Sequence, residues 1–224
     1  MFRIIRNGVP LVNGERVRKK QPNKKSEPAE TRADSDPPVR ADAQRNLEAL
    51  LKAAKAVFIK SGVAAPVREI AQQAGVGVGT FYRHFPQRSD LIVAVIRHEV
   101  DTCADAAPLL AKKHRPFQAL TRWIERYLEL IAAKRGLAAA LHSGDPAYDA
   151  LPAYFQERLR PALQSLLDAA AAAGEIREGI EAYDLLLAVA GVSSMSSHPA
   201  VNVGADHSQR MVELLIDGLR YQGQ

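Results

Sequence analysis

Apolar side chains recur every three or four residues along most of the chain, which is the period of an amphipathic α-helix. The first clear stripe predicts a helix over residues 41–62, which Gly62 ends. Its apolar positions are Leu47, Leu50, Leu51, Ala54, Val57 and Phe58. Arg45 lies near the start of this helix, where it is either a phosphate contact or part of a solvated face.

Two short helices separated by a tight turn are predicted over residues 67–85. Pro66 opens the first helix, and Gly75 ends it because glycine can adopt the left-handed conformation. The second helix, over residues 78–85, places Phe81 and Phe85 on one side. Its other faces carry groups suited to phosphates and base edges, namely Thr80, Tyr82, Arg83 and His84. The pattern predicts a helix-turn-helix unit.

The rest of the chain keeps the helical period and contains no alternating segment long enough for a strand. The expected helices run from Arg88 to about residue 106, from Pro116 past Ile131, and over residues 148–173, 182–192 and 207–221. We therefore expect an all-α fold, with an N-terminal three-helix unit and a larger helical body.

Residues 1–40 have few large apolar side chains and are rich in Lys, Pro, Glu, Asp and Ser. Burial cannot repay the ordering entropy of such a segment, so we expect a disordered basic tail. An Asn-Gly hairpin signal occurs in the first dozen residues, and Pro10 weakens it. The tail is a DNA-tracking arm, a solvated tail or an extension upstream of the true start. Net charge is +5 for residues 1–40, +4 for 41–98 and −4 for 99–224, so the front half suits a polyanion.

Residues 46–95 resemble the DNA-binding domain of TetR-type transcriptional repressors. Three motifs carry the resemblance in order, namely AxxxFxxxG at Ala54 to Gly62, IAxxAGV at Ile70 to Val76 and GTFYRHF at Gly79 to Phe85. The resemblance implies a DNA-binding domain over residues 41–98 and an effector-binding and dimerisation domain over residues 99–224. It also implies that the helix from Arg88 connects the two.

The resemblance further implies roles for individual side chains. Base contacts would come from Gly77, Val78 and Thr80, with Arg83 assisting, and phosphate contacts from Tyr82, His84 and Arg88. Many relatives have Ser or Thr at the position of Gly77 and Lys or Arg at that of Val78, so this chain has fewer donors for reading bases. Relatives also have a Thr pair where Ala65 and Pro66 stand, so the first short helix lacks a hydroxyl cap. Direct readout then rests on Thr80 and van der Waals contacts.

Aromatic and polar-tipped side chains gather in the predicted body helices. They are Trp123, Tyr127, His142, Tyr148, Tyr154 and Phe155. Aromatics at helical spacing suit a plain core, but by resemblance the central helices enclose an effector cavity, and such walls suit a small amphipathic ligand. The two terminal helices add an apolar face with small residues at Ala188, Ala190 and Gly191, which predicts a four-helix homodimer interface. Residues 132–148, AAKRGLAAALHSGDPAY, are similar to one subgroup of the family.

Other classes of function fit the sequence poorly. The single cysteine, Cys103, excludes an internal disulfide and a Cys-rich zinc site, and we expect no cofactor or metal. His142, Ser143 and Asp145 lie too close in sequence for a hydrolase triad, and GVGVGT lacks the Lys of a phosphate-binding loop. No secretory signal is visible, and the longest uncharged run, residues 185–205, is too polar for a membrane span, which favours a cytoplasmic protein.

The predicted function is a sequence-specific DNA-binding transcriptional regulator. We expect a homodimeric repressor that a small-molecule effector releases from double-stranded operator DNA. Two alternatives stay open. A ligand-independent architectural DNA-binding protein would account for the basic tail and the few base-reading donors, and a hydrolase would use the His142 turn.

Overall fold

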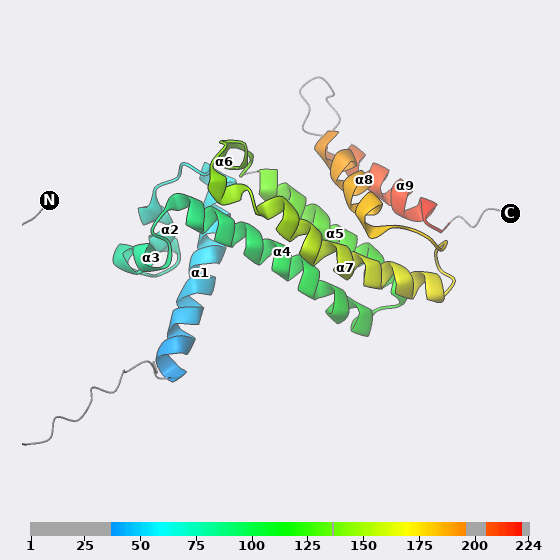
Figure 1. The fold of residues 1–224 in the computed structure, drawn as a ribbon, viewed down its shortest axis with the longest axis horizontal. Helices are drawn as coiled ribbons and strands as arrows, with labels where there is room; N and C mark the ends of the chain where they lie inside the picture. Colours follow the sequence, from blue (N-terminus) through cyan, green and yellow to red (C-terminus); the bar gives the residue numbers. More distant parts are fainter. Residues whose placement is uncertain (1–36, 136, 196–204, 221–224) are drawn as a thin grey trace, which may run out of the picture. The chain divides into compact units, whose positions relative to one another are not determined.

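The computed structural model describes residues 37–135, 137–195 and 205–220, whose helices are drawn in Figure 1. The elements are α1 (Pro37–Ser61), α2 (Val67–Gln73), α3 (Val78–His84), α4 (Arg88–Lys113), α5 (Pro116–Arg135), α6 (Ala138–Leu141), the 3-10 turn η1 (Pro146–Tyr148), α7 (Leu151–Ala172), α8 (Ala182–Met195) and α9 (Ala205–Gly218). All regular structure in these ranges is helical, which confirms the predicted all-α fold. The tail was predicted over residues 1–40. Residues 1–36 lie outside the described residues, and the prediction is wrong for residues 37–40, which are helical.

The first helix, α1, begins at Pro37 rather than at residue 41. Proline is tolerated in the first turn of a helix, because the N–H groups there have no partner inside the helix. The helix ends at Ser61, and Gly62 follows with a φ of +74°. The predicted apolar stripe is buried from Leu50 to Phe58, with Leu47 packed against it.

The predicted helix-turn-helix is formed by α2 and α3. Gly75, with a φ of +71°, ends the first helix as expected, and the Val76 N–H donates to the carbonyl of Ala71 at 3.0 Å. Phe81 and Phe85 are both buried, with their ring centroids 5.7 Å apart. These rings belong to the core cluster that also contains residues of α1, α2 and α4, and they hold α3 against it.

Helix α4 is longer than the sequence suggests. The expected end near residue 106 is wrong, because the helix continues through Pro108 to Lys113. An internal proline costs about 3 kcal/mol or more, and burial of Ala104, Ala106 and Ala107 next to it offsets that cost. The expected domain boundary between residues 98 and 99 thus falls inside one continuous helix, which contacts α1 as well as α5 and α7.

The body is built around α4, α5 and α7, which pack against one another; α8 lies against α5 and α7, and α9 lies against α8 (Figure 1). Trp123 of α5 is fully buried at the contact with α4, where its Nε1 donates to the Cys103 carbonyl at 2.8 Å. Its ring stacks on that of Tyr127, with centroids 5.9 Å apart. Helix α8 extends to Met195, and α9 ends at Gly218, close to the predicted bounds.

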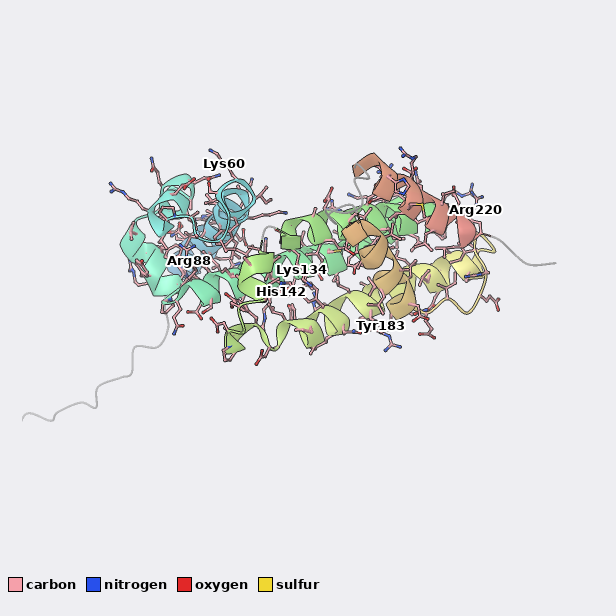
Figure 2. The ribbon with its side chains drawn as sticks, turned by 90° about the horizontal axis from the view of Figure 1, so that it is seen from above. Lys60, Arg88, Lys134, His142, Tyr183 and Arg220 are labelled. Atoms are coloured by element: carbon pink, nitrogen blue, oxygen red, sulfur yellow. The ribbon has the colours of Figure 1, made fainter. Side chains whose placement is uncertain are left out.

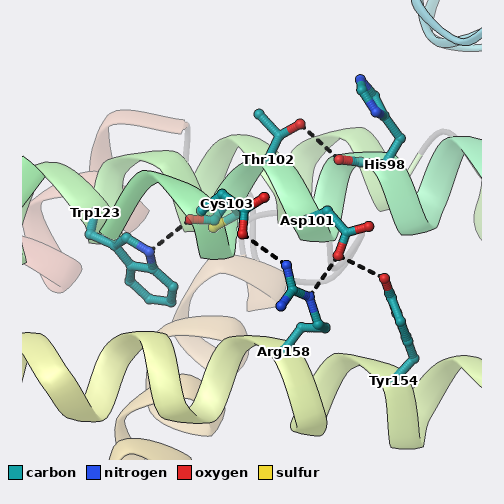
Figure 3. Close-up of polar contacts among 8 residues, drawn as sticks. His98, Asp101, Thr102, Cys103, Trp123, Tyr154 and Arg158 are labelled. Carbon is teal, nitrogen blue, oxygen red and sulfur yellow. Dashed lines mark hydrogen bonds and ion pairs between the residues drawn. The ribbon is translucent and has the colours of Figure 1, made fainter. Parts of the chain in front are cut away.

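An ionic cluster joins α4 to α7 (Figure 3). Arg158 of α7 donates through Nε to Oδ1 of Asp101 at 2.7 Å and through its terminal nitrogen to Oδ1 of Asp105 at 2.8 Å. The Tyr154 hydroxyl donates to the same Asp101 oxygen at 2.7 Å. These contacts fix the register of the two helices. Among the described residues, no helix is both long enough and apolar enough to cross a membrane.

Candidate nucleic-acid interface and ligand cavity

Helix α3 presents a free tyrosine hydroxyl on its outer face. Tyr82 is 52% exposed, and its ring lies edge-on against Phe81, with centroids 5.4 Å apart. Its hydroxyl has no hydrogen-bond partner among the described residues. Phe81, only 1% exposed, holds the helix from behind. The Tyr82 hydroxyl is therefore held in place by its ring and available to an external acceptor such as a phosphate oxygen.

Two predicted base contacts are brought together on α3. A terminal nitrogen of Arg83 lies 3.1 Å from Oγ1 of Thr80, and Arg83 Nε donates to the carbonyl of Gly79 at 3.4 Å. Val78, the first residue of α3, is 39% exposed. Helix α3 thus offers a guanidinium from its last turn and a hydroxyl and a methyl-bearing side chain from its first, which match the acceptors and the thymine methyl of a major groove.

Gly77 and Gly79 offer backbone rather than side chains. A Cβ at either position would meet nothing within 4 Å, and neither residue has a positive φ. Neither packing nor backbone geometry within the described chain therefore requires glycine here. Gly77 is the N-cap of α3, but Gly79 lies inside the helix, where glycine costs about 0.5–1 kcal/mol relative to alanine. We expect such a cost at a surface that another molecule approaches closely.

Arg88, predicted as a phosphate contact, has partners within the chain. Its guanidinium donates to the carbonyl oxygens of Val63 and Ala65, in the loop between α1 and α2. At the same end of α4, the Gln87 N–H donates to the Asp90 carboxylate at 2.9 Å. Arg88 therefore ties the start of α4 to the entrance of the helix-turn-helix and is not an exposed, unpaired cation.

The other two predicted DNA contacts, Arg45 and His84, lie on different helices. Arg45 is exposed on α1 and pairs with Asp42 one turn earlier. His84 is partly buried at the end of α3, with its ring 6.2 Å from that of Phe85. Arg45 is thus engaged by a carboxylate of its own helix, and His84 stands in the last turn of α3.

A second candidate site is a cavity of about 500 Å³ in the body. It lies between α5, the end of α6, η1, α7 and α8, and it is open to solvent. The apolar residues that line it are Leu130, Ile131, Leu141, Leu151, Pro152, Phe155, Leu159, Leu186, Leu187 and Ala190. The polar residues are Tyr127, Lys134, His142, Tyr148, Gln156 and Tyr183. In Figure 2, Lys134, His142 and Tyr183 are labelled on three different segments of this wall.

The predicted effector residues divide into two groups. Tyr127, His142, Tyr148 and Phe155 line the cavity. Trp123 does not line the cavity, because it is buried against α4. Tyr154 does not line it either, because its hydroxyl bonds to Asp101. The guanidinium carbon of Arg97 lies 4.8 Å from the centroid of the Tyr154 ring. Lys134 and the α8 residues of the cavity wall were not predicted from the sequence. Lys134 stands seven positions after Tyr127 on the same helical face, which is the signal that could have revealed it.

Burial changes the chemistry of several groups in the cavity wall. It raises the pKa of Tyr127 to about 12, and the hydroxyl donates to the Leu186 carbonyl at 3.2 Å. Burial also raises the pKa of Tyr148, with a further contribution from Asp145. Desolvation lowers the pKa of Lys134. The hydroxyls therefore act as neutral hydrogen-bonding groups near neutral pH.

Comparison with known proteins agrees with this geometry. Residues 50–95 match the family described as "Bacterial regulatory proteins, tetR family", and residues 115–221 match the family "Transcriptional regulator SbtR-like, C-terminal domain". A TetR transcriptional regulator from Streptomyces coelicolor is 39% identical, with 79% of this chain and 99% of that chain covered and a TM-score of 0.67. A TetR transcription regulatory protein from Mycobacterium vanbaalenii is 33% identical, with 82% and 100% covered and a TM-score of 0.63.

Curated relatives match a shorter segment. An HTH-type transcriptional regulator from Staphylococcus aureus is 38% identical over 64 residues, which are 28% of this chain. The match spans 35% of the length of that relative. The fold and the α2–α3 surface define a helix-turn-helix protein of the DNA-binding class. The family matches cover both the N-terminal and the C-terminal part of the chain. The chain belongs to the TetR family of transcriptional regulators, which are not enzymes.

Proposed function

We propose that this protein is a repressor that binds a pseudo-palindromic operator as a homodimer and leaves it when a small molecule occupies the body cavity. The observation that carries the proposal is the outer face of α3, where Tyr82 and the Arg83–Thr80 pair stand on a helix that Phe81 and Phe85 fix from behind. A helix held in this way can enter a major groove without rearranging its own core.

Charge supports the same surface. Residues 60–88 include four cations and a single carboxylate, and α3 itself carries no acidic side chain. They are Lys60, Arg68, Arg83 and Arg88 against Glu69. Of these cations, Arg88 is engaged by backbone carbonyls, so phosphate attraction rests mainly on the other three. Arg45 would have to leave Asp42 to add to it. Such contacts supply affinity that does not depend on sequence, while the first turn of α3 reads the bases.

The homodimer is supported by apolar side chains that the single chain leaves uncovered on its last two helices. Leu187 of α8 is 54% exposed, Leu214 of α9 is 64% exposed, and Met211 is also exposed. Two copies packed through α8 and α9 would bury these side chains in a four-helix interface. A two-fold dimer would also present two α3 helices to successive major grooves, about 34 Å apart.

The domain assignment follows as part of the proposal. Residues 41–98 would bind DNA and residues 99–224 would bind the effector and dimerise, with α4 running through the boundary. A continuous helix can carry a displacement from the cavity wall to the helix-turn-helix, because it moves as a rigid element. A regulator of operator DNA works where the chromosome lies, so we place the protein in the cytoplasm.

The alternative of an architectural DNA-binding protein rests on Gly77 and Val78, which offer no side-chain donors to bases. The ligand cavity favours the regulator, because a purely architectural protein has no need of one.

Footprinting of the full chain on the DNA that flanks its own gene tests the proposal. A regulator should protect an inverted repeat whose half-sites are about one helical turn apart. Diffuse protection that follows no repeat and shifts with protein concentration would support the architectural alternative and refute the proposed operator.

A further inference from the structure

The body cavity has an uneven charge. None of its sixteen lining residues carries a carboxylate, while one, Lys134, carries an ammonium group. The remaining polar members are neutral hydroxyls, an amide and the ring of His142, whose Nδ1 donates to the Ala138 carbonyl at 2.7 Å and leaves Nε2 for other contacts. A charged ligand that enters this cavity therefore meets positive charge only.

Lys134 has no carboxylate partner among the described residues. Its Nζ lies 4.7 Å from the centroid of the Phe155 ring, and it forms no ion pair with any described residue. By contrast, Lys55 in the neighbouring crevice pairs with Glu99 at 2.5 Å. Desolvation by the cavity wall lowers the pKa of Lys134. An ammonium without a counter-ion beside apolar walls is stabilised when a ligand supplies the negative charge.

We infer that the cavity takes an amphipathic organic anion, with a carboxylate that pairs with Lys134 and an apolar body that lies among the leucines and Phe155. This inference deepens the proposed effector-binding function and rests on it. The volume of about 500 Å³ falls in the usual range for a small-molecule site. A single cation suits a singly charged head, and the largely apolar wall argues against a polyanion such as a nucleotide.

The position of Lys134 also links ligand binding to the DNA-binding helices. Lys134, Leu130 and Phe155 line both the cavity and a crevice of only about 10 Å³. Phe58 and Ile59 of α1 also line this crevice, as does Glu99, whose carboxylate is paired with Lys55. A ligand carboxylate that draws the Lys134 ammonium away from the Phe155 ring would change the packing around Phe58 and Ile59, near the C-terminal end of α1. A ligand of this class therefore reaches the side chains through which the body contacts the helix-turn-helix unit.

Isothermal titration of the full chain with three probes of equal chain length tests the inference. The probes are decanoate, decanol and decylamine, each titrated below its own aggregation limit. Decanoate should bind, and decanol should bind about tenfold or more weakly because it lacks the charge-assisted hydrogen bond to Lys134. Decylamine should not bind, because its ammonium group would meet the like charge of Lys134. Lys134→Met should weaken decanoate by a similar factor and leave decanol unchanged.

The matched control is Lys112→Met, an exposed lysine near the end of α4, which should leave all three titrations unchanged. Melting curves of both variants should coincide with that of the parent protein. Equal binding of decanoate and decanol, insensitivity of decanoate to Lys134→Met, or no binding of decanoate up to its aggregation limit would each overturn the inference.

The same probes separate this inference from the proposed function. If decanol displaces the protein from its DNA as well as decanoate does, effector control stands and the anionic class is wrong. If decanoate binds through Lys134 without changing DNA affinity, the ligand class stands and effector-controlled release is wrong.

Discussion

The hydroxyl of Tyr82 offers a sharp test of the DNA-binding surface, because removing it changes one atom. In Tyr82→Phe the ring and its edge-on contact with Phe81 are kept. The hydroxyl is exposed and has no partner among the described residues, so the free energy of unfolding should change by no more than about 0.5 kcal/mol. Any larger effect on DNA binding then comes from the interface itself.

The size of that effect can be estimated from the proposed contact. A hydrogen bond to a charged phosphate contributes about 1.5 kcal/mol at the lower end of its range. This corresponds to roughly a twelvefold loss of affinity for one α3 helix. A homodimer places two such helices on one operator, so the expected loss is roughly 150-fold if the two contacts add.

Fluorescence anisotropy on the footprinted operator measures this loss. The slope of log K against log salt should stay unchanged, because a neutral hydroxyl releases no counterion when it binds a phosphate. Ser165→Ala, which removes an exposed hydroxyl on α7 away from α3, is the control and should bind the operator as the parent protein does. Operator affinity within twofold of the parent protein for Tyr82→Phe, at unchanged stability, would refute the proposed phosphate contact.

Three further predictions concern other parts of the molecule. Arg88→Ala should lower the free energy of unfolding by about 1–3 kcal/mol, because the hydrogen bonds to the Val63 and Ala65 carbonyls are lost. The slope of log K for DNA binding against log salt should stay unchanged. A normal melting curve with a smaller slope would show that Arg88 contacts phosphate instead. Burial raises the pKa of Cys103 to about 12, above the unfolded value of 9.0, so alkylation near pH 8 should occur only when the protein unfolds. The stability contributed by the neutral thiol should fall as the pH rises from 9 toward 12. Rapid alkylation of the native protein would contradict the burial of Cys103. Leu214→Arg should give a monomer by light scattering at micromolar concentration with native helix content, whereas an unchanged dimer would exclude α9 from the interface.

The helix-turn-helix could be predicted closely because its signals are local. Gly75 must adopt a positive φ to end α2 within one residue, and Phe81 and Phe85 repeat at the period of a helix. Both features follow from neighbours in the sequence. Helix α4 shows the limit of such signals, because its passage through Pro108 depends on burial against α5 and α7, which lie further along the chain.

The cavity could be predicted only in part. Aromatic residues at helical spacing identify a buried face, but they do not tell which buried side chains border a hollow. Trp123 and Tyr127 stack on each other, yet only Tyr127 reaches the cavity. The role inferred for Lys134 depends on two facts about the described residues: no carboxylate lines the cavity, and the nearby Glu99 is paired with Lys55. Both are properties of packing between helices distant in sequence.

Binding of the full chain to the DNA that flanks its own gene, compared with a scrambled duplex of equal length and composition across a salt series, tests the central claim most directly. A sequence-specific regulator should bind the native fragment at least about 10³-fold more tightly at physiological salt, and the difference should persist with excess competitor DNA. Equal affinities that fall together steeply with salt would contradict it, because they would leave phosphate attraction as the whole of the interaction.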